Sequence, residues 1–324
     1  MGAKLRLLAP LKTFALCITA SLALTATITA AAAQTTPVLA NGDEPPEALP
    51  PAPAALPTGS VGGMGDINLF PKRVVIDERA RIASVGLYNR AVAAGEYEIT
   101  ISDMAMQRDG HLVDLASIKD PATREAVHTA SGFLRWSPRH VALPASEAQM
   151  VRIMARVPPE LPPGEYRSHF TVVSVPPETG GTSIDEAAGG ETGGGIGVRI
   201  VPRFGISIPV IVRVGETTLT AGLKDLKLNT APGTPAALSL TITRDGTRSA
   251  FGDILITAPG AKKPVAEIKG IGVYTEITER AIQVLLDPAT DPRFLAHGTR
   301  WTVSYIDDDM SPGKVLARQE FIVP

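Results

Sequence analysis

The feature that most constrains the fold is a succession of short segments in which apolar and polar residues alternate. From Ile67 to the end of the chain, these segments are separated by turn sequences such as RDGH, LPASE and VPPELPPGE. Alternation places every second side chain on one face of a β-strand. The 30 glycines, the 28 prolines and the low aromatic content of 5% are typical of β-rich chains with many turns. The sequence therefore predicts an all-β protein.

The alternating segments form two series, as expected for a chain of 324 residues. Residues 66–215 contain about seven strand-like segments, which predict an immunoglobulin-like sandwich without the cysteine pair of antibody domains. A short helix or a mobile loop is expected within residues 113–130. Residues 216–324 repeat the strand spacing and predict a second sandwich of the same class.

One strand-like segment, RIVPRFGISIPVIVRV (199–214), is unusually long. Its even-numbered positions are apolar from Ile200 to Val214, interrupted only by Pro202. A strand of this length would extend about 50 Å, although a typical strand has about 5–6 residues. The glycine-rich acidic loop before it, residues 176–197, far exceeds the usual hairpin loop of about 2–5 residues. We expect this region to be mobile until a partner binds it.

The N-terminus predicts export from the cytoplasm. Residues 1–33 combine three cations, an apolar run and a small-residue cleavage site, as in a secretory signal peptide; an uncleaved membrane anchor is the alternative. Residues 34–65 are rich in proline and alanine and predict a disordered tether. Removing the signal peptide also removes Cys17, the only cysteine. The mature chain therefore has no disulfide and no thiol nucleophile.

Charge and motif content argue against several classes of function. The mature chain has 28 Lys and Arg against 33 Asp and Glu, a net charge of −5 that does not suit a nucleic-acid surface. The five histidines have no metal-ligand spacing, and no nucleophile elbow or phosphate-binding loop is present. Residues 307–309 (DDD) fit a polar hairpin turn better than a cation site. We therefore predict no catalytic residue, no metal, no cofactor and no small-molecule substrate.

The chain resembles the periplasmic pilus-assembly chaperones of the PapD type in the order of several segments over residues 66–324. These segments are FPKRVVI (70–76), LRWSPRHVALPASEAQMVRI (134–153), LPPGEYRSHF (161–170), IPVIVRVGE (208–216), SAFGDILI (249–256) and GVYTEIT (272–278). The resemblance implies two immunoglobulin-like sandwiches in an L-shaped, boomerang-like arrangement with a cleft between them. It also implies a periplasmic, non-enzymatic chaperone that caps pilus or fimbrial subunits and delivers them to an outer-membrane usher.

The resemblance further implies two kinds of site. The last strand of the first domain donates alternating side chains to a subunit, which falls here on Ile200, Pro202, Phe204, Ile206 and Ile208. Arg73 matches the arginine that grips the subunit's C-terminal carboxylate, and Arg213 matches a second arginine of the family. A lysine of the family is replaced by Pro209. Either Arg203, Lys72 or another cation is the expected substitute, or the carboxylate is anchored in a different way.

Two other functions fit parts of the sequence. A secreted structural or adhesive fibre module of two immunoglobulin-like domains would account for the tether. An enzyme, such as a metal-dependent hydrolase built on a β-sandwich, would need a ligand cluster that the sequence does not contain.

Overall fold

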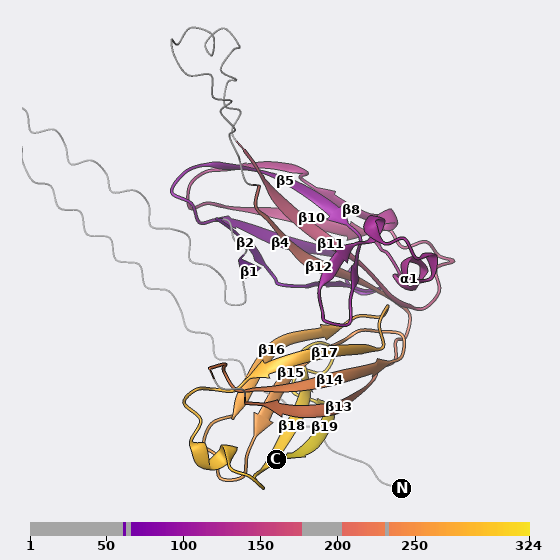
Figure 1. Cartoon of the computed structure of the whole chain (residues 1–324). Coiled ribbons are helices and arrows are strands. Elements are labelled where there is room, and N and C mark those ends of the chain that lie inside the picture. Colours follow the sequence, from indigo (N-terminus) through magenta and orange to yellow (C-terminus); the bar gives the residue numbers. More distant parts are fainter. Residues whose placement is uncertain (1–60, 63–65, 177–202, 231–232) are drawn as a thin grey trace, which may run out of the picture. The chain divides into compact units, whose positions relative to one another are not determined.

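The computed structural model describes residues 61–62, 66–176, 203–230 and 233–324. The predicted signal peptide, nearly all of the tether and residues 177–197 of the glycine-rich loop lie outside the described residues. Ile200 and Pro202 also lie outside them. The described residues belong to one compact unit, Pro51–Pro324. They form two β-sandwiches, so the prediction of a two-sandwich, all-β fold is confirmed (Figure 1).

The first sandwich packs two five-stranded sheets face to face. One sheet contains, in spatial order, β1 (Val61–Gly62), β2 (Ile67–Phe70), β4 (Ile82–Asn89), β10 (Ala148–Ala155) and β8 (Leu134–Ser137). The other contains β3 (Val74–Ile76), β12 (Gly205–Val214), β11 (Gly164–Val175), β5 (Gly95–Ser102) and β9 (His140–Leu143). Apolar side chains of alternating positions, such as Leu87, Ile153 and Phe170, fill the space between the sheets.

A connecting segment with local structure joins β5 to β8. It begins with a hairpin of β6 (Met104–Met106) and β7 (Leu112–Asp114) and continues through two short 3₁₀ turns, Leu115–Ser117 and Ser131–Phe133. Between these turns lies α1 (Pro121–Ala126), which confirms a helix within residues 113–130. The Asp120 side chain accepts a hydrogen bond from the Thr123 amide, and Pro121 occupies the first turn, so sequence alone explains where α1 begins. No described helix has the length and hydropathy needed to span a membrane.

The second sandwich has a three-stranded and a four-stranded sheet. The strands of the first are β13 (Thr220–Asn229), β14 (Ala237–Asp245) and β17 (Glu279–Leu285). Those of the second are β16 (Ala266–Val273), β15 (Ala250–Thr257), β18 (Arg300–Asp307) and β19 (Val315–Ile322), and a 3₁₀ turn, Pro292–Leu295, precedes β18. Trp301 and Tyr305 are the largest side chains buried in its core. In Figure 1 these strands carry the orange and yellow colours.

Candidate functional site

The strand β12 leaves part of its backbone without a neighbour. On one side it pairs with β11 over its whole length, from Gly205 to Val214. On the other side it pairs with β3, in parallel, only from Val210 to Val212. Among the described residues, Gly205–Pro209 is therefore an open sheet edge. An open edge is a template for pairing with another strand.

The register of β12 shows which backbone groups face this open edge. The Ser174 amide donates to the Phe204 carbonyl at 2.8 Å, so Phe204 directs its backbone toward β11. Because hydrogen-bonding direction alternates along an antiparallel strand, Gly205, Ser207 and Pro209 direct theirs toward the open edge. Pro209 has no N–H, so its place on the outer side breaks no bond of the β11 ladder. Because Val210 is the parallel partner of Val74, the Pro209 carbonyl faces the first amide of β3, so the edge offers the amides and carbonyls of Gly205 and Ser207.

The side chains of the apolar row on β12 have a different environment from the one we expected. Ile206 and Ile208 are 7% and 1% exposed and belong to the core of the first sandwich. Phe204 is 38% exposed. From Ile206 onward the row thus faces the protein's own core in the free chain, because the opposite sheet covers that face. Donation of Ile206 and Ile208 to a partner stays a prediction that would require them to leave this core.

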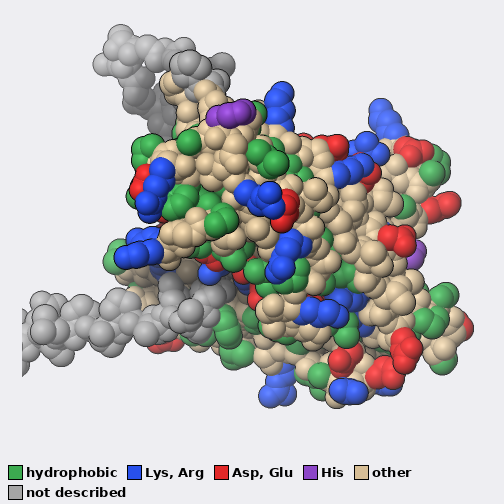
Figure 2. Space-filling view, turned by 90° about the horizontal axis from the view of Figure 1, so that it is seen from below, with side chains coloured by type: hydrophobic (Ala, Val, Ile, Leu, Met, Phe, Trp, Pro, Cys, Tyr) green, Lys and Arg blue, Asp and Glu red, His purple; other side chains and the backbone are tan. Residues whose placement is uncertain are grey.

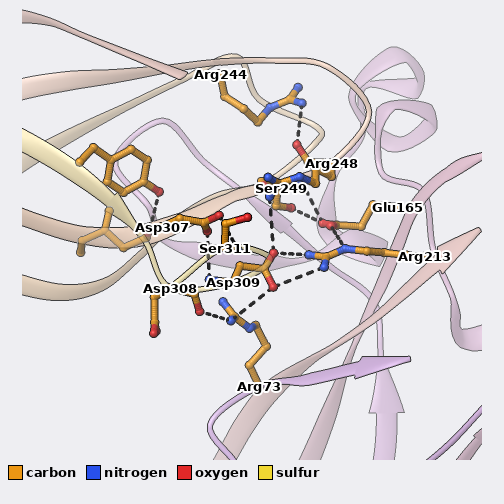
Figure 3. Close-up of polar contacts among 12 residues, drawn as sticks. Arg73, Glu165, Arg213, Arg244, Arg248, Ser249, Asp307, Asp308, Asp309 and Ser311 are labelled. Carbon is orange, nitrogen blue, oxygen red and sulfur yellow. Dashed lines mark hydrogen bonds and ion pairs between the residues drawn. The ribbon is translucent and has the colours of Figure 1, made fainter. Parts of the chain in front are cut away.

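Arg213 lies in a buried ionic triad. Its Nε donates to Glu165 on β11 at 3.2 Å, and its Nη1 donates to Asp309 at 3.3 Å, with a second, shorter contact from Nη2 to the same carboxylate. Figure 3 shows Arg213 between these two acids. Burial alone would lower the pKa of Arg213, but the carboxylates of Asp309 and Glu165 raise it above its ordinary value. The positive charge of Arg213 is therefore already balanced by carboxylates of the same chain.

Arg73, which immediately precedes β3, approaches the same carboxylate from another side. Its Nη2 lies 3.5 Å from Asp309 Oδ1 and donates to the Asp308 carbonyl at 2.8 Å. Its guanidinium carbon lies 3.8 Å from the centre of the Phe251 ring. Its Nη1 is buried and has no hydrogen-bond partner among the described residues. Arg73 thus keeps one donor group that no described residue accepts.

The turn between β18 and β19 supplies the acidic group of this cluster. The Asp307 carboxylate accepts hydrogen bonds from the amides of Asp309 and Ser311, both at 3.0 Å, and so shapes the turn. The hairpin-turn interpretation of residues 307–309 therefore agrees with the structure. What the sequence did not indicate is that the Asp309 side chain points toward three arginines, the third being Arg248 at 3.6 Å (Figure 3).

We name this group of charged residues the arginine cluster; it comprises Arg73, Arg213, Arg244, Arg248, Glu165, Asp307 and Asp309. The cluster contains four arginines and three buried carboxylates, although Arg244 donates only to carbonyls and Asp307 accepts only from amides. The nearby Asp308 is matched by Lys72 at 3.5 Å. The Glu165 carboxylate also accepts a hydrogen bond from Ser249. The cluster therefore carries one positive charge that no buried carboxylate balances, and this favours the binding of an anion.

The predicted substitutes for the missing lysine lie in different places. Lys72 lies at the rim of the arginine cluster through its contact with Asp308. Arg203 lies ten residues before Arg213, about 33 Å away along an extended strand, and pairs with Glu98 at 3.4 Å. Arg203 therefore does not belong to the cluster. Arg248, which the sequence interpretation did not single out, does.

A second buried ion pair lies further along β11. Arg167 contacts Glu276 at 2.7 Å and stacks on the Tyr274 ring, with its guanidinium carbon 3.6 Å from the ring centre. Next to it, His169 is fully buried, and neither ring nitrogen has a partner among the described residues. Burial, together with the charge of Arg167, lowers the pKa of His169 to about 3. His169 is therefore neutral at physiological pH.

The described residues contain no group of three His, Cys, Asp or Glu side chains that could hold a metal ion. On the face shown in Figure 2, basic side chains are scattered among acidic, apolar and other side chains. This face has no continuous basic patch of the kind that binds nucleic acid.

No protein-family model matches the chain, and no curated protein matches it in sequence. Among solved structures, the chain is similar to one in the chaperone–tip adhesin complex of CFA/I fimbriae biogenesis, at 11% identity and a TM-score of 0.39, over 80% of this chain and 98% of that one. It is similar to the YadV chaperone at 14% identity and a TM-score of 0.38, over 79% and 99% of the two chains. It is also similar to the Escherichia coli chaperone DraB at 15% identity and a TM-score of 0.37, over 79% and 95%. Similarity at this level does not establish a shared function, because one fold serves many functions.

Proposed function

We propose that this protein is a periplasmic chaperone that caps pilus or fimbrial subunits by strand pairing and passes them to an outer-membrane usher. The observation that carries the proposal is an unbalanced positive charge at the end of an open sheet edge. Arg73 contributes to that charge and has a buried Nη1 without an acceptor. The same site therefore offers backbone groups for a strand and a guanidinium for a carboxylate.

The topology supports a specific orientation for the bound strand. On the outer side of β12, β3 begins at Val74 opposite Val210, and the space beside Gly205–Pro209 is open. A partner strand that fills this space must end where β3 begins, next to Arg73. The end that suits an arginine is a C-terminal carboxylate. The partner strand would therefore run parallel to β12 and end at the arginine cluster.

The long apolar row suits such a partner as well. Phe204 is exposed at the end of β12 and continues the parity of Ile200 and Pro202. A subunit that lacks one strand could take up these side chains in its own groove while its last strand pairs with the edge of β12. Export by the predicted signal peptide would place the chaperone in the same compartment as the subunits. No catalytic step is required.

The test uses the mature protein purified from the periplasm of its own cells, together with whatever binds it. We expect a small β-rich protein in a one-to-one ratio. Ser207→Pro removes an amide from the open edge without removing a bond to β11, and we expect it to abolish co-purification. Ser207→Ala keeps the amide and is the matched control.

A second pair of variants tests the anchor. Arg73→Ala should abolish co-purification, because the carboxylate loses its partner, whereas replacement of the exposed Arg79 by alanine should not. Circular dichroism and thermal melting check that each variant is folded. Normal subunit capture by folded Ser207→Pro and Arg73→Ala proteins would refute the proposal. Self-association without a subunit would instead favour a structural fibre module.

A further inference from the structure

We propose that Asp309 competes with the ligand carboxylate for Arg73. In the free protein Asp309 contacts Arg73, and the ligand carboxylate replaces it there on binding. This inference rests on the proposed function. Asp309 would then make binding selective for ligands with a carboxylate, because only such a ligand can replace Asp309 as the acidic partner of Arg73. A strand with a neutral C-terminus forms the backbone hydrogen bonds but supplies no charged partner for Arg73.

The distances support an exchange at Arg73 rather than a disruption of the whole cluster. Among the described residues, Asp309 is the only acidic partner of Arg73, and the two side chains lie 3.5 Å apart without a hydrogen bond. With Arg213, by contrast, Asp309 makes two hydrogen bonds. Asp309 can therefore stay on Arg213 while Arg73 turns to a ligand. Of the contacts with Arg73 and Arg213, the weaker one, with Arg73, is the one that is exchanged.

The charge balance explains why Asp309 lowers the affinity for a ligand carboxylate. An incoming carboxylate is attracted by the arginines but repelled by Asp309, which is only 6% exposed and is not screened by water. Without the Asp309 charge, the cluster would have two unbalanced positive charges instead of one. The Phe251 ring and the Asp308 carbonyl would still hold Arg73 in place.

The exchange also has a structural consequence. Arg73 belongs to the first sandwich, and both of its polar partners belong to the turn between β18 and β19 of the second. A ligand carboxylate that takes over Arg73 releases this turn from one of its contacts with the first sandwich. We therefore expect binding to change the hydrogen exchange of the turn. In the free protein its amides at Asp309 and Ser311 donate hydrogen bonds to Asp307.

The experiment measures the affinity of the mature chain for a short, fluorescein-labelled peptide of alternating Thr and Val, with either a free C-terminal carboxylate or an amide. Fluorescence anisotropy gives Kd for both peptides. We expect the wild-type protein to prefer the carboxylate form. Asp309→Asn should bind the carboxylate form about tenfold more tightly and the amide form unchanged. Asp308→Asn, at the rim, is the matched control and should leave the ratio of the two Kd values unaltered.

The outcomes separate the inference from the proposed function. If the wild-type protein binds neither peptide, or binds both equally, the proposed function fails, and the inference with it. If the wild-type protein prefers the carboxylate but folded Asp309→Asn leaves that preference unchanged or weakens it, only the role of Asp309 is overturned. Should Asp309→Asn not fold, hydrogen exchange of the wild-type protein decides. The carboxylate peptide, and not the amide peptide, should accelerate hydrogen exchange at residues 309–311 severalfold. Equal exchange rates with the carboxylate peptide and without it would overturn the inference.

Discussion

Replacing Ile208 by alanine tests whether the apolar row of β12 belongs to the core of the first sandwich in solution. The Ile208 side chain is 1% exposed and packs among the apolar residues of that core. Ser207, one residue earlier, directs its side chain to the opposite face, where its hydroxyl lies 2.9 Å from that of Thr171. Ser207→Ala is therefore a control on the same strand.

The expected cost follows from the burial of Ile208. The substitution removes three carbon atoms, worth about 2.4 kcal/mol at roughly 0.8 kcal/mol for each buried methylene. The cavity that remains raises the loss to about 3–4 kcal/mol, because a two-sheet core relaxes only partly around it. Ser207→Ala loses one partly buried hydroxyl contact, which costs about 1 kcal/mol. The difference between the two variants is thus at least about 2 kcal/mol.

The assay is urea unfolding followed by tryptophan fluorescence. The chain has two tryptophans, Trp136 in the first sandwich and Trp301 in the second, so a Trp301→Phe background reports the first sandwich alone. The midpoint should fall for Ile208→Ala at an unchanged m-value. A loss below about 1 kcal/mol at equal m-value would show that Ile208 is not a core residue in solution. The row would then be presented to a partner along its whole length.

Four further predictions concern the rest of the site. Arg213→Ala leaves Glu165 buried without its arginine and removes both hydrogen bonds that Asp309 accepts from Arg213, so it should cost about 3–5 kcal/mol in urea unfolding; a neutral result would contradict the triad. The pKa of His169 is lower in the folded state than in the unfolded chain, so the free energy of unfolding should be unaffected by this residue above about pH 6.5. Below that pH it should decrease by up to about 1.4 kcal/mol per pH unit toward pH 3, and His169→Gln should remove this dependence. Gly110 has φ of +88°, a conformation that residues with a Cβ rarely adopt, so Gly110→Ala should strain the β6–β7 hairpin and accelerate its proteolysis; an unchanged rate would refute this strain. Phe204→Asp should remain folded, because Phe204 is partly exposed, but should lose subunit capture; a collapse in melting temperature would place Phe204 in the core.

The sequence predicted those parts of the fold that depend on neighbouring residues. Alternation from Gly205 to Val214 indicated a strand, and the Asp120–Pro121 pair explains where α1 begins. These features depend on local geometry, because side-chain direction in a strand and helix capping involve only a few adjacent residues. The two series of strands likewise predicted two sandwiches. The excess length of the apolar row was visible as well, but its surroundings were not.

The candidate site could be predicted only in part. Arg73 and Arg213 were singled out through the family resemblance, and the structure brings both to the same carboxylate. Glu165 and Asp309, which hold Arg213, were missed because they lie 48 and 96 residues away from it in the sequence. No local pattern specifies such a pairing. It follows from the register of β12 on β11 and from the position of a turn in the other sandwich.

By itself, the sequence determined that the chain forms strands, that β12 has one apolar face, and which positions carry the cations. Tertiary structure decided what covers that face: the opposite sheet buries Ile206 and Ile208 and leaves Phe204 exposed. It also decided that β3 pairs with only part of β12, and that three arginines share Asp309. The physical reason is that alternation defines two faces of a strand without saying what each one contacts. Burial and ion pairing arise only when distant segments come together.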